Sequence, residues 1–108
     1  MKTFTKRDIV KHVAQLRKSD LTTSAKWVDD IFSAIRDIMM TADPALRIEV
    51  RDFGVFEVKQ TKSKPKARNP KTGEIIQVPP RRKTHFKPSK LLKKFLSQPL
   101  VHTIIDQK

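Results

Sequence analysis

The chain has 108 residues and a formal net charge of +13, and its isoelectric point is about 10.4. A chain of this length forms at most one domain. So large a charge on so small a protein repels itself, and it is tolerated most easily when the usual partner is a polyanion. Nucleic acid is the leading candidate, and an anionic membrane surface is the alternative. The absence of cysteine excludes disulfides, thiolate catalysis and zinc knuckles.

The sequence predicts a cytoplasmic protein. No apolar run approaches the ~20 residues that a membrane-spanning helix needs. The first five residues, Met1–Thr5, lack the apolar stretch of a signal peptide.

The charge is distributed unevenly along the chain. Residues 1–57 carry ten lysines and arginines against nine acids, a net charge of +1. Residues 58–94 carry thirteen basic residues and one acid, Glu74, a net charge of +12. We therefore expect the first part to build the body of the protein and the second part to meet the partner.

Two helices are predicted in the first part. Thr5 is a suitable N-cap, and Asp8 three residues later resembles a capping box. Thr22 is expected to cap a second helix from about Thr23 to Thr41, which ends before Pro44. Its apolar stripe, with steps of three and four residues, consists of Trp27, Val28, Ile31, Phe32, Ile35, Ile38 and Met39.

The hydrophobic period then changes from helical to alternating, which indicates strands. The expected elements are a strand over 46–50, a turn at Asp52-Phe53-Gly54, a second strand from Val55, a third strand from Ile75 to Phe86, and a last helix with Pro88 in its first turn.

The stretch from about 59 to 82 predicts two strands joined by the turn Arg68–Gly73. This arm has no hydrophobic face, and an isolated two-stranded ribbon is marginal in water. Proteins place such ribbons in DNA grooves; the alternative is a solvated surface hairpin. We expect one domain over 1–98, including the arm, and a tail over 99–108.

Without the arm, the body is small and supplies little core of its own. The broad apolar stripe of the second helix needs more cover than one short sheet offers. The sequence therefore favours a dimer, although a core stripe of a monomer is the alternative.

Three stretches resemble the HU and integration host factor family of bacterial histone-like proteins, which bend DNA. They are the turn into the second strand, the tip of the arm and the start of the last helix: Phe53–Val58, Arg68–Gly73 and Phe86–Lys93. The order of the elements also agrees over residues 1–96.

The resemblance implies an α+β fold with two N-terminal helices, a three-stranded antiparallel sheet with a long β-ribbon arm, a short C-terminal helix, and an intertwined dimer. It implies an architectural protein of the bacterial nucleoid that bends and compacts double-stranded DNA through the minor groove. Pro70 would be the intercalating wedge. The partner chain would be an identical copy or a paralogue.

The resemblance assigns the other site residues as well. DNA contacts are expected from Lys59, Lys62, Lys64, Lys66, Arg68, Asn69, Lys71, Arg81, Arg82, Lys83, Lys87, Ser89 and Lys90. The dimer core is expected to include Trp27, Ile31, Phe32, Ile35, Phe53 and Phe56.

Two positions depart from the family pattern, because Asp52 and Ser89 stand where glycine is usual. A left-handed backbone position tolerates aspartate better than most residues. Ser89 is able to cap the last helix or to bind phosphate.

Nothing in the sequence supports catalysis, a metal site, a cofactor or a small-molecule substrate. The three histidines, His12, His85 and His102, lack metal-ligand spacing, and two glycines provide no glycine-rich phosphate loop. A basic RNA-binding protein of ribosomal type is the alternative function. The arm has no aromatic residue for base stacking, which disfavours sequence-reading RNA modules but not backbone binding.

Overall fold

The structure is a computed structural model that describes residues 1–62, 64–68, 71–73 and 75–100. The strand segments 64–68 and 75–78 are described by their backbone alone. The chain divides into two compact units, Met1–Thr41 and Ala42–Lys108. Each unit is described by itself.

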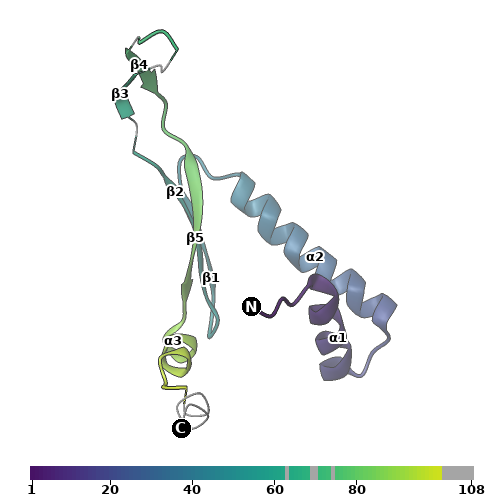
Figure 1. Cartoon of the computed structure of the whole chain (residues 1–108). Helices are drawn as coiled ribbons and strands as arrows, with labels where there is room; N and C mark the ends of the chain where they lie inside the picture. Colours follow the sequence, from purple (N-terminus) through teal and green to yellow (C-terminus); the bar gives the residue numbers. More distant parts are fainter. Residues whose placement is uncertain (63, 69–70, 74, 101–108) are drawn as a thin grey trace. The chain divides into compact units, whose positions relative to one another are not determined.

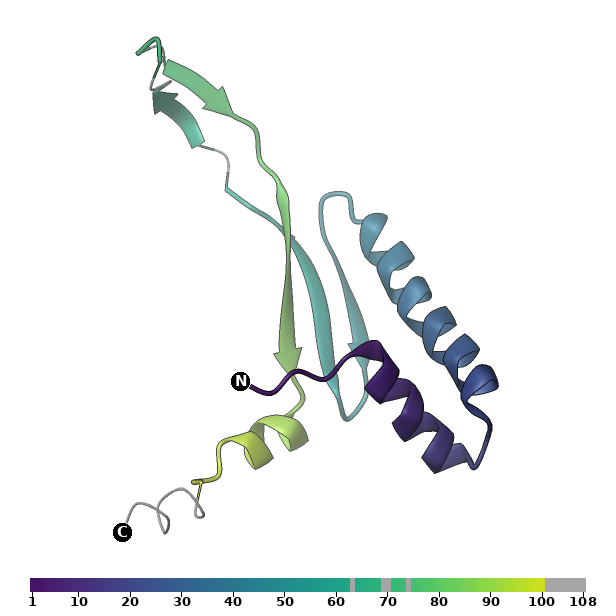
Figure 2. The same cartoon turned by 45° about the vertical axis from the view of Figure 1, so that its right-hand side comes forward.

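The first unit is a helical hairpin of α1, Lys6–Arg17, and α2, Leu21–Met40 (Figures 1 and 2). The predicted start of α1 is confirmed: the Asp8 carboxylate accepts hydrogen bonds from the Thr5 amide at 2.8 Å and the Thr5 hydroxyl at 3.1 Å. A thin core joins the helices, and its buried residues are Val10, Ala14, Ser24 and Val28.

The cap predicted for the second helix at Thr22 is wrong. Asp20 caps α2, because its carboxylate accepts a hydrogen bond from the Thr23 amide at 3.2 Å. The connection is short because Lys18 ends α1 in the left-handed region, with φ 52°. The hydroxyls of Ser19 and the fully buried Ser24 lie 2.8 Å apart and satisfy each other inside this corner.

Much of the apolar stripe of α2 has no cover within the described chain. Trp27, Ile31 and Phe32 expose 42%, 57% and 43% of their surfaces, whereas Ile35 is half-buried. Isolated exposed apolar residues are ordinary, but several on one helix face mark an interaction surface.

The second unit contains a three-stranded antiparallel sheet in the order β1-β2-β5 (Figure 1). A separate pair, β3 and β4, forms an antiparallel ribbon in the chain between β2 and β5, and α3 follows β5. The bounds are β1 Leu46–Val50, β2 Gly54–Gln60, β3 Lys64–Arg68, β4 Ile75–Val78, β5 Arg82–Pro88 and α3 Lys90–Leu96.

The predicted third strand, Ile75 to Phe86, is divided into β4 and β5. Pro79 and Pro80 lie between the two pieces. Because proline has no amide hydrogen for a strand ladder, two consecutive prolines interrupt the pairing.

Aromatic rings pack together at the end of the sheet where a turn joins β1 to β2. The ring of Phe86 lies 5.0 Å from that of Phe56 and 5.2 Å from that of Phe53, measured between centroids. Phe56 and Phe86 are paired across β2 and β5, so both rings lie on the same face of the sheet. Val58, two residues along the same face of β2, is buried.

The two departures from glycine have different structural consequences. Asp52 has φ 66°, which confirms a left-handed position that aspartate occupies. Ser89 caps α3, since its Oγ accepts a hydrogen bond from the Leu92 amide at 3.2 Å. Pro88 is therefore not in the first helical turn as predicted; it is the last residue of β5 and is paired with Gly54.

The described elements confirm the predicted α+β fold class: two N-terminal helices, a three-stranded antiparallel sheet with an inserted β-ribbon, and a short third helix. Among the described helices, none combines the length and apolar character that crossing a membrane requires.

The absence of a side chain at Gly54 allows β2 to approach β5 closely, so a substitution at this position tests the packing of the sheet. A Cβ atom there would overlap the Lys87 carbonyl oxygen and come within 2.7 Å of the Phe86 ring. We expect Gly54→Ala to lower the free energy of unfolding by about 2 kcal/mol or more, as overpacking does. Urea denaturation at fixed protein concentration measures the change.

Gly73→Ala is the control, because among the described residues beyond its two chain neighbours no atom lies within 4 Å of the added Cβ, although φ is +74°. Backbone strain alone costs about 1 kcal/mol. Equal losses in the two variants would contradict the close-approach explanation.

Candidate nucleic-acid interface

The pairing register gives the three-stranded sheet two chemically different faces. Leu46, Val58 and Thr84 are partners on one face, as are Ile48, Phe56 and Phe86. Because side chains alternate along a strand, the residues between them share the opposite face. That polar face consists of Arg47 and Glu49 from β1, Val55, Glu57 and Lys59 from β2, and Lys83, His85 and Lys87 from β5.

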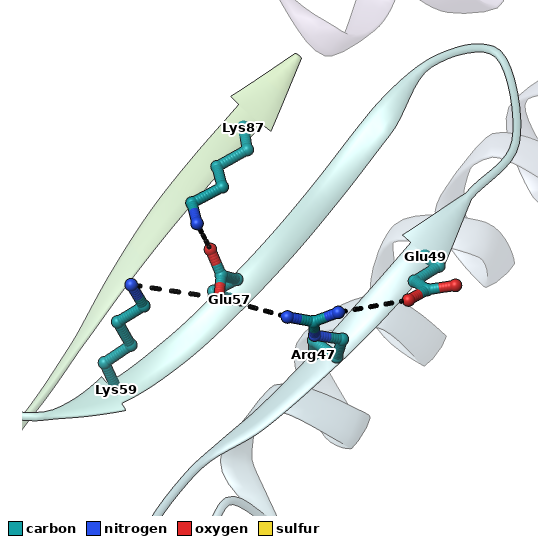
Figure 3. A network of polar contacts seen from close by, with 5 residues as sticks. All are labelled: Arg47, Glu49, Glu57, Lys59 and Lys87. Atoms are coloured by element: carbon teal, nitrogen blue, oxygen red, sulfur yellow. Dashed lines mark hydrogen bonds and ion pairs between the residues drawn. The ribbon is translucent and has the colours of Figure 1, made fainter. Parts of the chain in front are cut away.

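Glu57 lies at the centre of the polar face (Figure 3). The Lys87 Nζ atom lies 3.0 Å from its Oε1, and the Lys59 Nζ and Arg47 Nη2 atoms lie 3.9 Å from its Oε2. Arg47 also donates a hydrogen bond to Glu49 at 3.3 Å. The carboxylate therefore links cations from all three strands.

The pKa of Glu57 is lowered from its ordinary value of 4.5 by the Lys87 ammonium first, and further by the charges of Lys59, Lys87 and Arg47. Desolvation opposes this shift without reversing it. Glu57 is thus held as a carboxylate at neutral pH, and the polar face remains an arrangement of opposed charges with an excess of cations.

A hydrogen-bonded neck connects the sheet to the ribbon. The Thr61 amide and hydroxyl donate to the Arg81 carbonyl at 2.6 and 3.1 Å, and the Arg81 amide donates back to the Thr61 hydroxyl at 2.8 Å. Next to it, the Arg82 guanidinium donates to the Ala42 carbonyl at 2.6 Å. The neck therefore holds the two chain segments of the arm together where they leave β2 and β5.

Only some of the residues predicted to contact DNA lie on the polar face. Lys59, Lys83 and Lys87 lie together on the polar face, whereas Lys62, Lys71, Arg81 and Lys90 are exposed beyond it. Arg82 has an exposed side chain that is nevertheless tied to the backbone of the body.

The remaining predicted contacts are three residues of β3, two residues outside the description, and Ser89 at the start of α3. Lys64, Lys66 and Arg68 are on β3, where the backbone pairs Arg68 with Ile75, but their side chains are outside the description. Asn69 and Pro70 lie outside the described residues. Ser89 is engaged as a cap, and its amide donates to the Phe53 carbonyl at 2.9 Å.

Three polar residues at this site were not found from the sequence. Glu57 and Arg47 are brought together by strand pairing, and Thr61 is joined to Arg81 across 20 residues of chain. The only available signal for Glu57 was its place directly before the basic segment. Counting charges along the sequence does not show which strand residues are paired, so it could not show that Glu57 lies among basic side chains.

Comparison with known proteins places the chain in a family. The family model described as bacterial DNA-binding protein matches residues 4–97. DNA-binding protein HU 1 of Bacillus subtilis is 36% identical over 88 residues, which are 82% of this chain and 91% of that protein. Integration host factor subunit alpha of Myxococcus xanthus is 33% identical over 108 residues, which cover 97% of this chain and 81% of that protein.

A solved structure shares the fold. It is the Anabaena HU–DNA cocrystal structure, with a TM-score of 0.69, 24% sequence identity, and coverage of 89% of this chain and 100% of the other. The chain belongs to the bacterial DNA-binding protein family, which is a family of architectural proteins rather than of enzymes. Within that family it is similar to both HU and integration host factor. The ribosomal-type RNA-binding alternative gains no support from these matches.

The lowered pKa of Glu57 predicts a stability that depends on acid pH. A carboxyl whose pKa is depressed on folding contributes stability above its unfolded pKa, and the contribution is lost as pH falls through the folded pKa. We therefore expect the free energy of unfolding to fall as pH drops below 4.5. In Glu57→Gln this fall should be shallower, and the remaining part should come from other carboxyls such as Asp8 and Asp20, whose pKa values are also lowered.

Urea denaturation at a series of pH values measures this dependence. Glu49→Gln, which removes an exposed carboxylate from the same face, controls for the change in net charge. An unchanged pH dependence in Glu57→Gln would show that the ion pairs of Glu57 add nothing to stability.

Proposed function

We propose that this protein bends and compacts double-stranded DNA, with its arms in the minor groove and without catalysing a reaction. The observation that carries the proposal is that basic residues of the polar sheet face are followed along the chain by the basic residues of the arm. Lys59 and Lys83 are paired at the end of the sheet, and the chain segments beyond them form the β3–β4 ribbon. Two-stranded β-ribbons bind in DNA grooves.

Phosphate contacts supply most of the affinity in this proposal. Lys59, Lys83 and Lys87 would neutralise phosphates over the sheet, and Lys90 would do so at the start of α3. Lys62, Lys64, Lys66, Lys71 and Arg81 would do the same along the arm, with Arg82 stabilising its base. Such contacts fix the position of a protein on DNA without reading sequence.

The arm tip would supply the bend. Arg68 and Asn69 would lie against the minor groove, and Pro70 would enter a base step. Its place in the sequence, between the residues of β3 and those of β4, supports this role. The cost of partial unstacking is offset by the longer contact that bent DNA makes with the protein.

A second copy of the chain completes the body in this proposal. The exposed face of α2, with Trp27, Ile31 and Phe32, is too apolar to remain in water on a small, thinly packed unit. Ile35, Phe53 and Phe56 would join it in the dimer core. Two copies would also place two arms on one DNA duplex, and a paralogue that shares the same apolar pattern would serve equally.

The proposal assigns residues 1–98 to one DNA-binding domain, with the arm at about 59–82, and treats 99–108 as a tail. It requires no cofactor, metal or small-molecule substrate. The bacterial nucleoid, in the cytoplasm, is the proposed location.

The proposal predicts a steep dependence of DNA affinity on salt. Each neutralised phosphate contributes about 0.9 to the slope of log affinity against log salt on duplex DNA. Lys83→Gln should make the slope shallower, whereas Lys26→Gln, the same charge change on α2, should leave it near the wild-type value. Fluorescence titrations of a short duplex at several salt concentrations measure both. A wild-type slope near zero would contradict the proposed function.

The wedge role predicts a selective effect of Pro70→Ala. The substitution should reduce DNA bending and remove the preference for nicked or gapped DNA, while affinity for straight duplex changes by less than about threefold because charge supplies it. Energy transfer between dyes at the duplex ends reports the bend, and parallel titrations report affinity. If Pro70 only shapes the turn, affinity for every DNA should fall alike.

A further inference from the structure

Glu57 is the most enclosed charged side chain on the polar sheet face. Only 8% of its side chain is exposed, compared with 67% for Glu49 on the neighbouring strand. Its Oε1 atom has no hydrogen-bond partner among the described residues other than the Lys87 ammonium 3.0 Å away. An enclosed carboxylate is costly unless it is paired, so Glu57 depends on the cations above it.

The three cations around Glu57 remain open to solvent. Arg47, Lys59 and Lys87 expose 62%, 51% and 53% of their side chains. A lysine ammonium has three donors and a guanidinium has five. Each cation can therefore keep its contact with the carboxylate and donate to a second anion on the outer side.

The carboxylate also counters the repulsion among these cations. Three positive charges drawn from three strands would separate if nothing negative lay between them. Glu57 lies among them, where it attracts all three, and its enclosure keeps an approaching phosphate from direct contact with the carboxylate. This makes the cluster a cationic patch with its side chains held before the anion arrives.

We infer that Glu57 is a positioning residue of the DNA interface, which holds Lys87, Lys59 and Arg47 in place to receive duplex phosphates on the sheet. The inference rests on the proposed function and extends it to an acidic residue. Net charge alone predicts that removing an acid from the interface strengthens DNA binding, whereas this inference predicts that removing the Glu57 carboxylate weakens it. Holding the cations in place reduces the side-chain entropy lost on binding.

The first experiment compares Glu57→Gln with Glu49→Gln. Both substitutions remove one negative charge from the same sheet face, but only the first removes the enclosed anchor. We expect duplex DNA affinity of Glu57→Gln to be about fivefold weaker than that of Glu49→Gln at the same salt concentration. Equal or tighter binding by Glu57→Gln would overturn the inference.

A double-mutant cycle separates positioning from a general loss of structure. Glu57→Gln should have little further effect on DNA affinity in a Lys87→Met background, because its main contact is already gone. In a Lys83→Met background its full effect should remain, since Lys83 lies on the same strand and face but has no ion pair among the described residues. Equal effects in both backgrounds would contradict a role through Lys87.

A measurement on the wild-type protein covers the case in which Glu57→Gln does not fold. The Lys87 ammonium protons of the free protein should exchange with water more slowly than those of Lys83, as measured by nitrogen-15 NMR. Equal exchange of the two ammonium groups in the free protein would refute the inference. If the wild-type protein binds no DNA at all, the proposed function fails instead.

Discussion

The antiparallel pairing of β2 with β5 is the constraint on which the second unit depends. From Gly54↔Pro88 to Gln60↔Arg82, every residue of β2 has a partner on β5. A slip of one residue would move every side chain to the other face of the sheet. This register therefore fixes the aromatic packing on one face and the charge cluster on the other. It also brings the two segments of the arm together at Thr61 and Arg81.

Charge repulsion opposes the folding of this chain, whereas burial of apolar surface favours it. The segment 58–94 carries a net charge of +12, and a basic surface of that density opposes its own compaction. The structure offsets part of this repulsion by enclosing Glu57 between cations from three strands. The excess of positive charge over this segment favours binding to a polyanion. The same unevenness leaves residues 1–57 with a net charge of only +1, so little repulsion opposes burial of the apolar face of α2 against a second chain.

Local chemistry predicted where most elements begin, and its errors have local causes. Thr5 and Asp8 started α1 as expected. At α2 the prediction chose Thr22, but Asp20 is the stronger acceptor and lies at the shorter connection that the left-handed Lys18 allows. At α3 it chose Pro88, because proline suits a first helical turn; pairing with Gly54 instead keeps Pro88 in the sheet, and Ser89 caps the helix. At α3 strand pairing outweighed the intrinsic preference of proline, whereas at α2 the intrinsically stronger N-cap residue prevailed.

The sequence by itself determined the class of fold, the basic arm and the family resemblance, because periodicity, charge density and the motif Arg68–Gly73 are properties of consecutive residues. It also indicated that Asp52 occupies a left-handed turn position. Only the tertiary structure decided which charges meet. Arg47, Glu57 and Lys87 span 40 positions of the chain, and Thr61 lies 20 positions from Arg81. Their contacts are set by strand order and register, which arise from packing among distant segments and leave no periodic trace in the sequence.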